Sequence, residues 1–207
     1  MALVKYNNNS ISNVTELAGV PVGALTHIKT LTASSSSTLS FVDGSSDVVL
    51  DSTYPIYLFK FINIHPATDS VNFTFNMSTD GGSNYNVTKT TTSFRTIHNE
   101  ADGVTALDYQ TGHDIAQGTG FQILGDVIGS DNDQSSSGTL QIFNPSSTTF
   151  VKHFISTTNQ STSADYTDNL FIAGYGNTTS AVDAIQFKMS SGNIDAGTIK
   201  LYGIKDS

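Results

Sequence analysis

The sequence predicts an all-β fold, an antiparallel β-sandwich, and three observations support this prediction. Small uncharged polar residues dominate the chain, with 27 Ser, 27 Thr, 16 Asn and 17 Gly in 207 residues, and all four are poor helix formers. A hydrophobic fraction of 37%, with 12 Phe and 8 Tyr, is enough for a core and argues against disorder. After residue 23, apolar and polar residues alternate in most segments, as in strands with one buried face.

The first element along the chain is an N-terminal arm, residues 1–23. It contains an Asn run, a segment at residues 14–18 that is compatible with one helical turn, and a Gly-Val-Pro-Val-Gly bend. The arm is either a frayed terminus or an anchor to a neighbouring subunit. In the second case its larger apolar side chains would make the contact: Val4, Tyr6, Ile11, Val14 and Leu17.

Ten or more strands follow in the second region, the domain of residues 24–207. Alternation is clearest where Val71, Phe73, Phe75 and Met77 are separated by single polar residues. Residues 54–64 are nearly continuously apolar, which predicts a central strand covered on both faces. In chain order the predicted strands are 25–31, 38–42, 54–64, 71–77, 90–97, 120–128, 139–142, 149–156, 169–174, 185–189 and 198–202.

Turn residues separate these strands, as in Asp43-Gly44, Asn144-Pro145 and the loop 129–133. Many short strands joined in this way are typical of an antiparallel sandwich, and the jelly roll is the topology that we expect. Since no interior linker and no fixed-period repeat is visible, we predict one jelly-roll-like domain with a short arm.

Composition and charge exclude several classes of function. The net charge of −9 and a pI near 4.6 argue against a nucleic-acid partner, which would require clustered Lys and Arg. The chain has no Cys, hence no disulfide framework and no thiol chemistry. Its start lacks the apolar region of a signal peptide, and the longest apolar stretch is too short for membrane insertion.

Motifs for catalysis are missing. No Gly-x-Ser-x-Gly elbow occurs, and the five histidines lack metal-binding spacing, although a pairing of His98 with His113 across strands stays open. Glycoside cleavage would require two carboxylates in a cleft, and most Asp residues fall in turns. We therefore predict no catalytic residue and no cofactor.

A calcium site is the one metal site that we consider. Asp126, Asp131 and Asp133 lie in or beside an acidic segment. An EF-hand loop beginning at Asp131 would require Gly and Glu where the chain has Ser136 and Ile142. The candidates are therefore an irregular oxygen-rich site or a plain acidic hairpin loop.

Five segments resemble virion structural proteins of tailed bacteriophages, especially marine ones. They are VKYNNNSI at residues 4–11, FVDGSS at 41–46, YPIYLFKFINI at 54–64, FTFNMSTDGG at 73–82 and SGNIDAGTIKLYGI at 191–204. The resemblance spans most of the chain, and its motifs are strand and turn patterns without chemistry. It implies a non-enzymatic capsid decoration or fibre-type component on the virion exterior, made in the host cytoplasm.

The arm and the predicted sandwich together suggest homo-oligomers, with a trimer as one form, that bind other virion proteins such as the major capsid or tail proteins. The alternative is a module at a fibre tip that binds a host receptor or surface glycan. Its contacts would come from loop tyrosines: Tyr85, Tyr109, Tyr166 and Tyr175. A glycan depolymerase is a third hypothesis.

Overall fold

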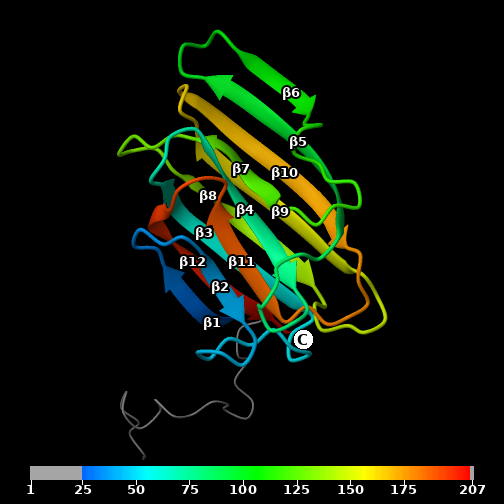
Figure 1. Ribbon diagram of the computed structural model, residues 1–207. Helices are drawn as coiled ribbons and strands as arrows, with labels where there is room; N and C mark the ends of the chain where they lie inside the picture. The colour runs from blue at the N-terminus through cyan, green and yellow to red at the C-terminus, as the bar shows by residue number, and fades with distance from the viewer. Residues whose placement is uncertain (1–24, 206–207) are drawn as a thin grey trace, which may run out of the picture.

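The computed structural model describes residues 25–205, which form two antiparallel sheets packed as a β-sandwich (Figure 1). The wide sheet has eight strands in the order β1-β12-β3-β8-β9-β10-β5-β6, and the narrow sheet has four in the order β2-β11-β4-β7. The strands of the wide sheet are β1 (Leu25–Thr32), β3 (Ile56–Pro66), β5 (Lys89–Asn99), β6 (Thr105–Tyr109), β8 (Ser136–Phe143), β9 (Lys152–Ser161), β10 (Tyr166–Gly176) and β12 (Ile194–Ile204). The narrow sheet contains β2 (Leu39–Val42), β4 (Val71–Ser78), β7 (Gln122–Ile128) and β11 (Ala184–Met189).

This architecture confirms the predicted fold class, and each predicted strand is present with shifted ends. Strand β6 is an addition that the sequence pattern does not predict. All five of its residues are exposed, so burial imposes no alternation that the sequence could reveal. It is held instead by backbone pairing with β5, in the register Phe94↔Tyr109 and His98↔Thr105. The described residues contain no helix able to cross a membrane.

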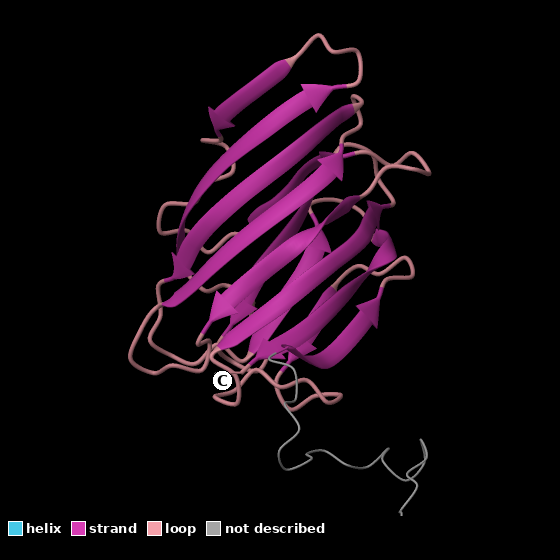
Figure 2. Cartoon of the chain, turned by 180° about the vertical axis from the view of Figure 1, so that it is seen from behind, coloured by secondary structure: helices cyan, strands magenta, loops and turns pink. Residues whose placement is uncertain are grey.

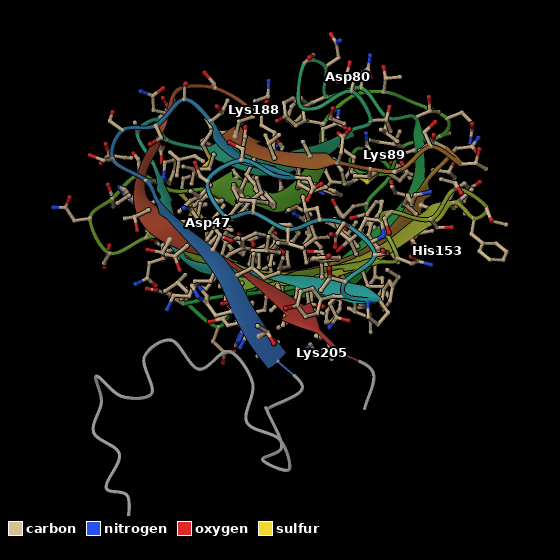
Figure 3. The ribbon with its side chains drawn as sticks, turned by 90° about the horizontal axis from the view of Figure 1, so that it is seen from below. Asp47, Asp80, Lys89, His153, Lys188 and Lys205 are labelled. Atoms are coloured by element: carbon tan, nitrogen blue, oxygen red, sulfur yellow. The ribbon has the colours of Figure 1, made fainter. Side chains whose placement is uncertain are left out.

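The core lies between the two sheets and is centred on Phe187 of β11. In the view from below, side chains fill the space between the two layers (Figure 3). The Phe187 ring is fully buried and lies 5.3–6.4 Å from five other rings, measured between centroids. Those rings come from both sheets: Phe41, Phe59, Phe61, Phe73 and Phe75.

The wide sheet extends past the narrow sheet at its β5–β6 end. There the segment 110–121 borders β5, with Thr91 N–H donating to the Ile115 carbonyl at 2.8 Å and Lys89 N–H to the Gly118 carbonyl at 2.8 Å. The opposite, outer face of the wide sheet is uncovered by any other described element (Figure 2). The outer face is therefore formed by side chains of regular strands, and the sheet holds these side chains in fixed positions.

Candidate functional site

Five adjoining strands of the wide sheet, β8, β9, β10, β5 and β6, turn only uncharged side chains outward. Burial alternates along these strands, and strand pairing places β6 in the same register. The outward positions are the odd-numbered residues of 137–143, 153–161, 167–175 and 105–109 and the even-numbered residues of 90–98. None of them is Asp, Glu, Lys or Arg. We call this surface the neutral face.

The formal charges of the same five strands all occupy inward positions: Lys89, Arg95, Asp108, Lys152 and Asp168. Lys89, Lys152 and Asp168 are buried there, although charged side chains usually stay in water, whereas Asp108 is exposed. Exposed sheet faces normally carry charges that oppose aggregation. The neutral face therefore lacks the charged side chains that exposed sheet faces usually carry.

An aromatic ridge crosses the neutral face. Tyr109, Phe94 and Phe171 are consecutive cross-strand neighbours on β6, β5 and β10. The rings of Phe94 and Phe171 stack with centroids 4.8 Å apart and 9° between their planes, although Phe94 and Tyr109 remain 44% and 50% exposed. Because each phenylalanine ring turns one face to the other, the pair has less ring face to offer a sugar than isolated aromatic side chains would.

A shallow hollow of about 450 Å³ lies beside this ridge, two residues farther along the strands. Thr92 and Ala173, which are cross-strand neighbours, provide small side chains within it. Ile155, His153, Tyr175 and Phe143 also line it. The ridge and the hollow thus form an aromatic and aliphatic area on a face whose other outward side chains are mainly Ser, Thr, Asn and Gln.

The rest of the outer face differs, because it carries positive charge. Lys60 of β3 and Lys200 of β12 lie directly opposite each other in the pairing register. The Lys60 ammonium lies 5.5 Å from the centroid of the Tyr202 ring, a cation–π distance. The outer face of the wide sheet thus has a neutral half and a basic half.

A partly buried ionic cluster lies on the inner side of the wide sheet, centred on Arg95, the only arginine of the chain. Arg95 Nη1 lies 3.3 Å from Asp126 Oδ2 and 3.4 Å from Asp168 Oδ2, and its Nε lies 3.7 Å from Asp108 Oδ1. His113 Nε2 is 3.4 Å from the other oxygen of Asp126. Three carboxylates therefore share one guanidinium and one imidazole.

Within this cluster, burial raises the pKa of Asp168 to about 6, against the lowering effect of the Arg95 charge and with a further increase from Asp126. Asp168 is 1% exposed, and its Oδ1 has no hydrogen-bond partner among the described residues. The cross-strand neighbour Gln160 is also buried there, with both polar side-chain atoms unpartnered. In the sequence, the only sign of this cluster is that charged residues occupy positions where the alternating pattern of a strand would place buried apolar residues.

Two buried lysines flank Gly176 on the inner side of the wide sheet, one on β5 and one on β9. Lys89 Nζ donates to Asn76 Oδ1 at 2.6 Å and to the Val87 carbonyl at 2.8 Å. Lys152 Nζ donates to the Phe150 and Thr178 carbonyls. Neither forms an ion pair within residues 25–205, and burial lowers the pKa of both, that of Lys89 to about 8.

A second, polar hollow of about 350 Å³ lies at the β5–β6 loop and the start of β10. Tyr166, Glu100 and Asn159 line it together with His98 and Asp102, whose side chains interact at 3.0 Å. Aromatic, amide and carboxylate groups of this kind hydrogen-bond and stack on sugars. Of the four tyrosines expected to bind glycans, only Tyr166 lies here.

The other residues singled out in the sequence are dispersed. Tyr109 and Tyr175 belong to the neutral face, whereas Tyr85 lies in the β4–β5 connection. His98 points outward, while His113 contacts buried Asp126, so the structure does not pair them. The arm residues lie outside the described residues: Val4, Tyr6, Ile11, Val14 and Leu17.

The structure does not join Asp126, Asp131 and Asp133 into one calcium site. Asp126 is 5% exposed and is engaged by Arg95 and His113. Asp131 and Asp133 are exposed in the β7–β8 loop. The Arg95 guanidinium compensates the Asp126 carboxylate, which removes the reason for it to bind a cation. Between residues 25 and 205 no group of three His, Asp or Glu side chains is arranged to hold a metal ion.

No protein-family model matches the chain, and neither a curated protein nor a solved structure matches it.

Proposed function

We propose that this chain is a non-enzymatic structural protein on the outer surface of a tailed-phage virion, acting as a capsid decoration or fibre-type component. It works by assembly, as a homo-oligomer that also binds other virion proteins. The observation that supports the assembly role is the neutral face, an uncharged surface crossed by exposed aromatic rings of the kind enriched at interfaces. The virion setting comes from the sequence resemblance.

The strand order supports a jelly-roll relationship. Consecutive strands change sheet at every connection except β5–β6, β8–β9 and β9–β10. When the four neighbouring strands β9, β10, β5 and β6 at one end of the wide sheet are set aside, the strand orders β1-β12-β3-β8 and β2-β11-β4-β7 remain. Two packed four-stranded sheets are the layout of an eight-stranded jelly roll, a fold used in viral capsids. We infer a jelly roll widened by four added strands.

Deletion of residues 1–21 tests the anchoring role of the arm. The core lies within residues 25–205, so the shortened chain should fold and unfold cooperatively. It should also fail to join particles, because the arm would supply main-chain and apolar contacts to a neighbour. Normal incorporation of the shortened chain, measured by quantitative mass spectrometry of purified particles, would rule out this role.

A second candidate function is recognition of a host glycan in the polar hollow that contains Tyr166. Purified protein should then bind a glycan array, and Tyr166→Ala should abolish the signal while Tyr175→Ala, on the neutral face, should keep it. Absence of binding, with many copies on each particle, favours decoration. Hydrolysis of the bound glycan would instead show a depolymerase, with Glu100 and Asp102 as the carboxylates to replace.

A further inference from the structure

We infer that the neutral face binds the neutral face of a second copy of this chain, with the aromatic ridge of each copy seated in the hollow of the other. This inference rests on the proposed assembly role and identifies the partner as a second copy of the same chain. The ridge is formed by Tyr109, Phe94 and Phe171, and the hollow is floored by Thr92 and Ala173.

Self-complementarity is the first argument. Phe171 and Ala173 lie two residues apart on β10 and point to the same side, as do Phe94 and Thr92 on β5; this separation is about 7 Å. A two-fold axis between the copies, crossing the strands midway between the two rows, places Phe171 opposite Ala173 of the second copy. The same rotation places Phe94 opposite Thr92, so large side chains meet small ones at both positions.

Charge is the second argument, and it favours an identical partner over an unrelated one. The chain carries a net charge of −9, so two copies repel each other at long range. In an isologous interface, a charged residue near the two-fold axis would also lie close to its own copy in the partner. A surface without Asp, Glu, Lys or Arg avoids this local repulsion. The basic half of the outer face, with Lys60 opposite Lys200, lies outside the ridge and hollow.

The available area is the third argument. Five strands spaced about 4.8 Å apart, with about eight residues each at about 3.3 Å, offer on the order of 600 Å² per copy. Stable specific interfaces bury about 800 Å² per partner, with the lower limit near ~600 Å². The neutral face is therefore large enough for a reversible dimer at the small end of this range.

Sedimentation of the full chain between about 1 and 500 µM tests the inference. The natural chain should show a reversible monomer–dimer equilibrium. Thr92→Glu places a carboxylate in the hollow of each copy and should weaken dimerisation at least tenfold. Thr32→Glu is the matched control, because Thr32 is also an exposed strand residue of the wide sheet but lies on β1. A monomer at every concentration, or equal effects of the two changes, would overturn the inference.

Protection of an introduced thiol from chemical labelling identifies what covers the hollow. The chain has no Cys, so Ala173→Cys supplies a single reporter in the hollow. Its maleimide labelling should slow as protein concentration rises, because dimerisation covers it. Labelling that is independent of concentration overturns the proposal. In that case, slow labelling that accelerates on deletion of residues 1–21 would identify the chain's own arm as the occupant. These solution results do not depend on particle incorporation, so this inference and the proposed function can fail separately.

Discussion

At the scale of single residues, the notable feature is formal charge inside the sandwich. Lys89, Lys152 and Asp168 are at most 1% exposed. The two lysines have only neutral oxygen acceptors among the described residues, whereas Asp168 shares Arg95 with two other carboxylates. Burial without full compensation makes the charged form costly, which makes stability depend on pH in predictable windows.

Lys89 should make the protein more stable as pH rises from 8 to 10.5. Its pKa is about 8 in the fold, against an ordinary lysine value of 10.5, so the unfolded chain binds more protons in this window and stability increases with pH. The contribution is about 3 kcal/mol in unfolding free energy. Urea unfolding of Lys89→Met should show a smaller rise than the natural chain, whatever its stability at pH 7, because Lys152, whose pKa is also lowered by burial, remains. Lys200→Met, on the outer face, should keep the full rise; an equally large rise in Lys89→Met refutes the assignment.

Asp168 should act in the opposite direction. Its pKa of about 6 exceeds the ordinary aspartate value of 3.8, so the native state binds more protons between about pH 4 and 6 and stability falls as pH rises. Asp168→Asn mimics the protonated form. Its unfolding free energy relative to the natural chain should increase by about 3 kcal/mol from pH 4 to pH 8. Asp195→Asn, at an exposed position, serves as the control, and parallel pH curves for Asp168→Asn and the natural chain would contradict the prediction.

Alternation in the sequence predicts the strands but not the contacts of these residues. Alternation shows that Asp168 and Arg95 lie on the inward side of their strands only when the position of the second sheet is known. Asp126 resembles a calcium ligand in the sequence because it precedes an acidic loop. Arg95, which pairs with Asp126 in the structure, is 31 positions away in the chain. Pairings at such separations are set by the order of strands in the sheet, which period-two patterns do not specify.

At the scale of elements, β11 links the two sheets through one side chain. Phe187 lies in the narrow sheet and contacts Phe59 and Phe61 of the wide sheet. Strand β6 shows the converse case, because none of its residues is buried and it is held by backbone pairing with β5 and by the ion pair of Asp108 with Arg95. Alternation therefore predicts β11 and misses β6.

Phe187→Ala should lower the free energy of unfolding by about 3–5 kcal/mol, because it removes a fully buried ring and leaves a cavity among five others. Phe150→Ala removes the same atoms from a ring that is 68% exposed and should change stability by less than about 0.5 kcal/mol. Thermal or urea unfolding of both variants measures the difference. Similar losses in the two variants would show that the core is not centred on Phe187.

At the scale of the whole molecule, the neutral face and the acidic total charge lead to a prediction about salt. Dimerisation through an uncharged surface leaves only the long-range repulsion between two molecules of net charge −9. Raising the ionic strength from about 0.02 to 0.5 M shortens the Debye length from about 20 Å to about 4 Å and screens that repulsion. The dissociation constant of the dimer should therefore fall as salt increases. An interface that instead used Lys60 and Lys200 against acidic groups would weaken with salt, so the sign of the salt dependence, measured by sedimentation equilibrium, decides which half of the outer face holds the partner.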